Sequence, residues 1–174
     1  MLLAGAGAAW YYHWKLPYGR RDCCLPCLIH GLRMYAHDND GWFPDGNSTS
    51  IDSLRKLFPV YATPLNVAGV SGDVTEVKLR LERGASIDDS VSSWVYWPGL
   101  RNDDDPGVAL IWERAEGVTG IGVRTKLGGH VVGFVDGSYR QILQSEWPAF
   151  VKDQEVLRSN ILQNRNGNGV ASQD

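Results

Sequence analysis

The chain has 174 residues, which suits one domain with a hydrophobic core of ordinary size. Its 43% hydrophobic and 21% charged residues are typical of a globular protein and exclude a disordered one. The net charge is −3 at pH 7 and the sequence has no long basic block, which argues against nucleic acid as the main partner.

Residues 1–16 form an apolar segment in which small residues precede a cluster of aromatic rings. A helix from Leu2 to Trp14 would reach about 20 Å, which is short of the ~30 Å hydrocarbon core of a bilayer. Three interpretations compete: the end of a membrane anchor, a short signal-like segment, and an apolar helix docked on a partner. We favour membrane association, because basic residues after the rings are typical of the headgroup level. The residues expected to contact the membrane or a partner are Leu2, Leu3, Trp10, Tyr11, Tyr12 and Trp14.

Three cysteines lie within five residues, at Cys23, Cys24 and Cys27. The last two have the spacing of a redox motif, but they do not follow a strand of a βαβ unit. A zinc site would need a second pair of ligands, and His30 is the only candidate nearby. We favour small apolar residues on a helix surface, and the sequence leaves open whether the cysteines are free, bridged or modified.

Apolar residues then recur at helical spacing, which predicts an amphipathic helix of about three turns. Its apolar face consists of Leu25, Leu28, Ile29, Leu32 and Tyr35. Because Pro26 is tolerated only in a first turn, the helix must begin near residues 23–25, and residues 37–41 end it.

Two shorter helices are expected next. Ser50 should cap a short helix that stops at Pro59. Asp73 with Glu76 resembles a capping box, and Gly84 should close the helix that this box begins.

Strands follow the helices. The segments 92–97 and 108–113 predict two strands, and residues 121–126 are weakly extended. Residues 128–143 predict a hairpin with Asp136-Gly137 at its turn, a dipeptide in which both residues can take positive φ. Ser145 should cap a final helix, and residues 164–174 are expected to be a disordered tail. This order indicates an α+β fold with helices on one face of a small antiparallel sheet.

Acidic loops are the candidate metal sites. Carboxylates at the helix exit and in a later turn offer the hard oxygen ligands that Ca²⁺ needs. The candidate calcium ligands are Asp38, Asp40, Asp45, Asp103 and Asp105. The EF-hand pattern fails because Thr49 stands where a Glu is required, so a helix exit and a solvated turn are the ordinary explanation.

His130 and Asp136 are the remaining polar candidates. At full strand extension they lie about 20 Å apart, so they cannot share a metal ion or a proton. We interpret His130 as a structural hydrogen-bonding residue and Asp136 as a turn residue. The sequence has no nucleophile elbow, phosphate-binding glycine loop or zinc-protease motif, so we expect no catalysis and no cofactor, with calcium as the one candidate.

Segments at both ends of the chain resemble the pseudopilin-like proteins of type II secretion and related systems. Met34 to Pro44 is similar to the exit from that family's long N-terminal helix, and Gly128 to Ser138 to its closing hairpin. Ser93 to Leu100 is similar to a strand end between them. The matches keep this order from about Leu25 to Leu143, and they are closest to the large pilin-like families of planctomycete- and verrucomicrobial-type bacteria.

The resemblance implies a fold in which an N-terminal helix packs on a small antiparallel sheet, with extra short helices and a C-terminal helix. The family's cleavable leader, its first Phe and its Glu at the fifth mature position are absent from this sequence. The family also usually has Asn where Cys24 stands. The implied organisation is an apolar membrane-associated or docking segment over residues 1–16, a pilin-like globular domain over residues 22–163, and the tail over residues 164–174.

The resemblance implies a non-enzymatic structural or assembly protein of a secretion or pilus-type membrane system. Its partners would be other protein subunits, with membrane contact through the N-terminus and the globular part outside the cytoplasm. The first alternative is an accessory subunit of a larger membrane complex that docks by its N-terminal segment. The second alternative is a small metal-dependent enzyme built around His130 and the acidic loops.

Overall fold

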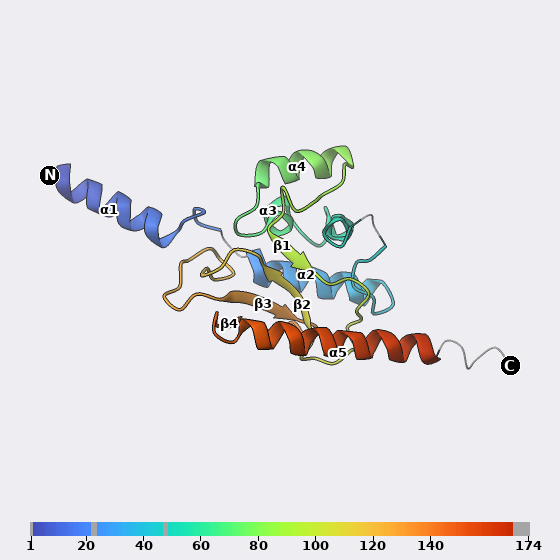
Figure 1. Ribbon diagram of the computed structural model, residues 1–174. Coiled ribbons are helices and arrows are strands. Elements are labelled where there is room, and N and C mark those ends of the chain that lie inside the picture. The colour runs from blue at the N-terminus through green and yellow to red at the C-terminus, as the bar shows by residue number, and fades with distance from the viewer. Residues whose placement is uncertain (1, 22–23, 47–48, 169–174) are drawn as a thin grey trace.

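A computed structural model of the chain describes residues 2–21, 24–46 and 49–168. The helices are α1 (Leu2–Lys15), α2 (Cys24–Asp38), the 3-10 helix η1 (Ile51–Leu57), α3 (Pro64–Ala68), α4 (Val74–Arg83) and α5 (Trp147–Asn168). The strands are β1 (Trp94–Tyr96), β2 (Ala109–Glu113), β3 (His130–Phe134) and β4 (Tyr139–Ile142). Figure 1 shows a body built around the sheet, with α1 projecting from one end of it.

The four strands form one antiparallel sheet in the order β1-β2-β3-β4. Each strand therefore pairs with its neighbour in the chain, so the sheet needs no crossover connection. The pairing of β2 with β3 shifts between Ala109 and Ile111, which is a local bulge. This sheet, with its helices and a C-terminal helix, confirms the expected α+β class.

Helices cover both faces of the sheet, whereas the sequence predicted helices on one face only. The alternation of β3 explains the difference, since Val131 packs in the core with α2 while Val132 and Phe134 pack in a second cluster. Phe150 of α5 lies against that second cluster, with its ring centroid 6.2 Å from that of Phe134. The sheet therefore lies between α2 on one side and α5 on the other (Figure 1).

α2 forms the centre of the larger cluster. Its buried residues include Leu25, Leu28, Ile29 and Leu32, four of the five residues predicted for its apolar face. The fifth, Tyr35, is half-buried and packs against the same cluster. Ile29 lies directly over Gly133 of β3, where an added Cβ would come within 2.5 Å of the Ile29 Cδ1 atom. The missing side chain at Gly133 is therefore what lets the helix approach the sheet so closely.

Three short helices cover the rest of this face. Asp73 caps α4 as predicted, because its side chain accepts a hydrogen bond from the Glu76 N–H, and Gly84 closes the helix in the left-handed region. The cap expected at Ser50 is wrong, since Ser50 makes no side-chain cap and Thr49 Oγ1 instead accepts from the Asp52 N–H. α3 has no counterpart in the prediction.

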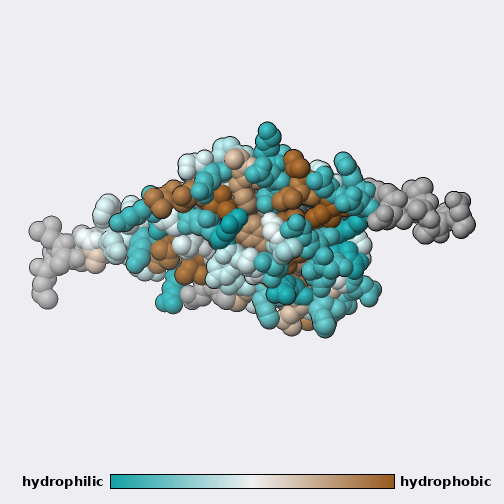
Figure 2. Space-filling model, turned by 90° about the horizontal axis from the view of Figure 1, so that it is seen from below, coloured by the Kyte–Doolittle hydropathy of each residue, from teal (hydrophilic) through white to brown (hydrophobic). Residues whose placement is uncertain are grey.

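The second face is closed by α5 and a layer of aromatic rings. The side-chain amide of Gln154 is buried, and its Oε1 accepts a hydrogen bond of 2.7 Å from the Ala109 N–H while its Nε2 donates to the Gly107 carbonyl. The ring contacts run from Trp97 to Trp112, then to Trp147 and on to Phe150. Seen from the α5 side, the surface carries hydrophobic residues in separate patches among hydrophilic ones (Figure 2).

The structure corrects three further details. Only Gly137 has positive φ at the β3–β4 turn, and the Gly137 N–H donates to the Phe134 carbonyl, so this is a type I turn followed by a glycine bulge. Residues 121–126 form no strand, and Arg124 makes only an isolated bridge with Val118. Residues 164–168 continue α5 instead of beginning a disordered tail, while residues 169–174 lie outside the described part.

Replacing Gly133 by Ala should lower the free energy of unfolding by about 1–3 kcal/mol, because the new methyl group meets Ile29. Ile29→Val removes the Cδ1 atom nearest to that methyl and should cost about 0.5–1.5 kcal/mol alone. The double variant should lose less stability than the sum of the two single losses, as measured by urea unfolding. Strictly additive losses would contradict a direct contact between Ile29 and Gly133.

Candidate functional site

The aromatic end of α1 is the largest group of exposed rings in the described structure. Trp10 is 70% exposed, Tyr11 53%, Tyr12 50% and Trp14 42%. The rings contact mainly each other and nearby residues along the helix, as in the stacked pair Tyr11 and Trp14 with centroids 6.3 Å apart. Leu2 and Leu3 also lie on α1, but their side chains are outside the described part. The residues named from the sequence as contact residues therefore share one projecting helix.

The base of α1 is fastened to a loop from the other half of the chain. The Arg124 N–H donates to the Lys15 carbonyl over 2.8 Å, and Arg124 Nε donates to the Trp14 carbonyl over 2.9 Å. The Arg124 guanidinium also lies 5.9 Å from the centre of the Trp14 ring. The two carbonyls belong to the last turn of α1, where helices leave such groups without partners inside the helix.

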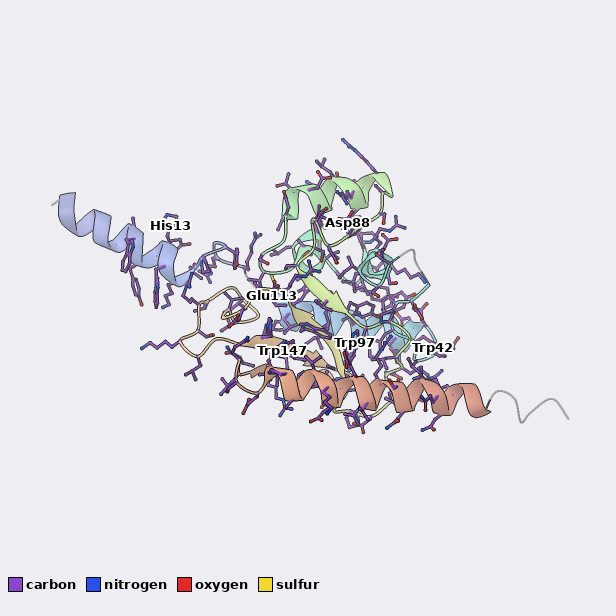
Figure 3. The ribbon with its side chains drawn as sticks, viewed as in Figure 1. His13, Trp42, Asp88, Trp97, Glu113 and Trp147 are labelled. Carbon is purple, nitrogen blue, oxygen red and sulfur yellow. The ribbon has the colours of Figure 1, made fainter. Side chains whose placement is uncertain are left out.

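The described helices include none that is both long and apolar enough to cross a membrane. His13 lies on α1 away from the body, whereas Glu113, Trp97 and Trp147 lie around the sheet (Figure 3). α1 thus carries its rings on an element of its own, separate from the hydrophobic core.

Glu113 is a buried carboxylate that sequence reasoning missed. It is 0% exposed at the end of β2, and four donors surround it. Its Oε1 accepts from Ser71 Oγ at 3.0 Å and the Ala115 N–H at 3.1 Å, and its Oε2 accepts from the Val70 N–H and Ser93 Oγ, both at 2.8 Å. Burial raises the pKa of the Glu113 carboxyl, and these hydrogen bonds act in the opposite direction.

The Glu113 cluster has a structural use. Val70 and Ser71 belong to the connection between α3 and α4, and Ser93 directly precedes β1. One carboxylate therefore holds the helix connection against two strands, and the polar atoms that this brings inside are hydrogen-bonded. No sequence pattern marks the site, because three of its four partners, Val70, Ser71 and Ser93, are 20 to 43 residues from Glu113.

His130 has the structural role that its sequence position suggested. Its Nδ1 lies 3.0 Å from the Glu113 carbonyl, and its ring lies 4.2 Å from that of Trp147. Asp136 acts in the turn, where its Oδ1 accepts a hydrogen bond from the Ser138 N–H. The two residues lie at opposite ends of β3 and its turn and make these separate contacts.

Four of the five candidate calcium ligands make hydrogen bonds or an ion pair with other groups of the protein. Asp38 accepts from the Tyr61 hydroxyl, Asp45 from the Gly46 N–H and Asp105 from the Gly107 N–H. Asp103 pairs with Arg101 at 2.9 Å, and the hydrogen bond from Arg101 lowers the pKa of that carboxyl. Asp40 occupies the left-handed region at the exit from α2. Within the described ranges no three His, Cys, Asp or Glu side chains form a group that could hold a metal ion, and calcium binding stays a prediction.

Two surface hollows flank β1. The larger one, of about 590 Å³, is lined by residues that include Ile51, Asp88 and Trp97, and the other, of about 380 Å³, by residues that include Ser71 and Asp89. The acidic groups there are already matched, since Asp88 pairs with Arg80 at 3.0 Å and Asp89 with Arg114 at 2.8 Å.

The cysteines differ from one another. Cys24 is a buried reduced cysteine whose Sγ faces the Leu65 carbonyl at 4.0 Å, and Cys27 is disulfide-bonded. Cys23 lies outside the described residues. The disulfide at Cys27 settles part of what the sequence left open, and bonds of this kind are typical of oxidising compartments.

Comparison with known proteins gives no relative, since no family model, curated protein or solved structure matches this chain.

Replacing Glu113 by Gln should lower the free energy of unfolding by about 1–3 kcal/mol, because the new NH₂ group faces a backbone N–H donor. The loss should also depend on pH. The raised pKa means that the folded state binds more protons than the unfolded chain above the ordinary Glu value of 4.5, so Glu113 contributes less stability as pH rises through its folded pKa.

The difference in urea midpoint between the wild-type protein and Glu113→Gln should therefore be larger near pH 4 than near pH 7. These two pH values lie on either side of the ordinary pKa of Glu. The exposed Glu116→Gln is the matched control and should change stability by less than about 0.5 kcal/mol. A difference that grows with pH would contradict the raised pKa of Glu113.

Alkylation of the denatured protein should distinguish the two described cysteines. Without reductant, iodoacetamide should modify Cys24 but not Cys27, and after reduction it should modify both, as read by peptide mass spectrometry. Modification of Cys27 before reduction would show that the disulfide is absent from the protein.

Proposed function

We propose that this chain is a non-enzymatic, pilin-like structural or assembly component of a secretion or pilus-type membrane system. α1 holds it at the membrane, and the α+β body lies outside the cytoplasm and contacts other protein subunits. The proposal requires no bound cofactor.

The observation that carries the proposal is the exposure of α1. A helix that is apolar on all sides and carries exposed Trp and Tyr rings is not stabilised by water. Lys15, Arg20 and Arg21 follow the rings in the chain. Amphipathic rings next to basic side chains suit the interface between lipid and water. A membrane surface would thus bury the exposed rings of α1, which the body leaves in contact with water.

The arrangement of the body supports the pilin-like part of the proposal. α2 packs along an antiparallel sheet whose strands follow one another, which is the arrangement that the resemblance requires. The segment after α2 also turns back to the sheet, since the Tyr96 hydroxyl donates to the Pro44 carbonyl over 2.7 Å and Phe43 is buried. Two of the segments that carry the resemblance, Met34 to Pro44 and Ser93 to Leu100, thus belong to one packed unit.

Two further observations support the location and the non-enzymatic role. A disulfide at Cys27 is typical of a compartment outside the reducing cytoplasm. The charged groups around β1 are paired with each other, as Asp89 is with Arg114 at 2.8 Å.

Vesicle flotation of the full chain tests the proposal. The wild-type protein should float with phosphatidylcholine and phosphatidylglycerol vesicles, and Trp10→Ser combined with Trp14→Ser should weaken binding at least about tenfold, because two exposed rings are lost. Val60→Ser is the matched control, since Val60 is 75% exposed on the body. Circular dichroism of each variant checks that the body is folded.

Failure of the wild-type protein to float would overturn the lipid contact. Purification of the same protein in a fixed ratio with membrane subunits would then favour the alternative, an accessory subunit that docks α1 on a partner protein.

A further inference from the structure

The loop between β2 and β3 is an ordered extension of the body. The Gly117 N–H donates to the Gly129 carbonyl, and the Thr125 N–H donates back to the Gly117 carbonyl, both at 2.8 Å. Inside the loop, the Thr119 N–H donates to the Val123 carbonyl at the same distance. These bonds give residues 117–129 a defined shape without a regular strand.

The same loop is held against both N-terminal helices. Arg124 bonds the last turn of α1, and the Leu25 N–H at the start of α2 donates to the Gly120 carbonyl over 3.2 Å. A Cβ on Gly122 would lie 3.3 Å from the Gly19 carbonyl oxygen in the connection between these helices. The loop and the base of α1 therefore form one end of the body, as Figure 1 also shows.

Apolar side chains of this loop are exposed at that end. Leu127 is 71% exposed and Ile121 is 45% exposed, although both belong to an ordered loop. Exposed Lys126 stands beside Leu127 in the chain. An apolar side chain flanked by a basic one is the combination that enters the boundary between acyl chains and headgroups.

The charge of this end is opposite to that of the rest of the chain. Residues 2–21 and 117–129 contain Lys15, Arg20, Arg21, Arg124 and Lys126 and no Asp or Glu. The whole chain has 17 basic and 20 acidic residues, so the remainder carries 12 basic and 20 acidic residues, a net charge of −8 against +5. An anionic surface is attracted to one end of this protein and repelled by the rest.

We infer that residues 117–129 form a second membrane contact, in which Leu127 and Ile121 enter an anionic lipid surface while Arg124 and Lys126 face its headgroups. This inference rests on the proposed membrane role of α1 and deepens it. Membrane contacts through both α1 and the loop, which Arg124 joins, fix the tilt of the body at the membrane. Contact through α1 alone would allow the body to rotate relative to the membrane.

Single reporters on the full chain test the inference. Leu127→Cys labelled with an environment-sensitive nitrobenzoxadiazole dye should shift to the blue and brighten with phosphatidylglycerol-containing vesicles, and much less with pure phosphatidylcholine. Labelled Trp10→Cys reports on α1, and labelled Val156→Cys reports on an exposed aliphatic position of α5. The wild-type protein, labelled under the same native conditions, corrects for any reaction of the natural cysteines.

The expected result is a shift at positions 10 and 127 and none at position 156. A shift at position 10 without one at position 127 would overturn the second contact and leave the proposed function standing. No shift at either of them would overturn both, and a shift at position 156 as well would overturn the oriented contact in favour of unspecific adsorption.

Charge substitution gives a second test that does not depend on a dye. Lys126→Ala should weaken binding to phosphatidylglycerol-containing vesicles about fivefold, the effect of one basic residue near an anionic surface. Lys152→Ala removes an exposed lysine from α5 and should leave binding unchanged. Equal effects of the two substitutions would contradict a contact through the loop.

Discussion

The close approach of α2 to the middle of the sheet is the constraint on which the rest of the body depends. A glycine in β3 leaves the space that Ile29 fills, and the helix buries its apolar stripe there. η1 and α3 then pack on α2, and they also contact other elements, η1 against β1 and α3 against α4. The burial of this stripe removes a large apolar area from water, which is the main favourable contribution to folding.

A polar cluster inside this apolar region specifies how the parts meet. Glu113 receives hydrogen bonds from the helix connection and from the segment before β1, so a shift of either would remove part of the donor set of a buried carboxylate. A carboxylate with four donors allows little displacement of the groups around it. These hydrogen bonds and the close packing of Ile29 on Gly133 together fix the register between the helical layer and the sheet.

Elements with local signals could be predicted from the sequence. The stripe of α2, the cap and the closing glycine of α4, and the hairpin at Asp136-Gly137 all depend on residues within a few positions of each other. α3 also has such a signal, a capping box of Thr63 and Asn66 with Pro64 in the first turn, but Asn replaces the usual Glu or Gln.

Features that depend on distant residues could not be predicted. The last turns of α5 contain Asn and Gly, which disfavour a helix, yet Arg165 bonds the Gly99 carbonyl and Asp104 and lies over the Trp42 ring. Tertiary contacts thus outweigh propensity there. The sequence predicts the aromatic residues of α1 as a contact surface, and the structure leaves their rings exposed. The loop that holds α1 could not be predicted, because Arg124 is 110 residues away from Trp14.

The position of α5 in the chain has a consequence for synthesis. This helix follows every strand, and it supplies the cover for the second face of the sheet, including Trp112 and Phe134. While the chain leaves the ribosome, that aromatic face stays open to other molecules until α5 has emerged. The Ala109 N–H likewise lacks its acceptor until Gln154 has emerged. The nascent protein therefore passes through a stage at which a chaperone has an apolar surface to bind, and the arrival of its last helix ends that stage.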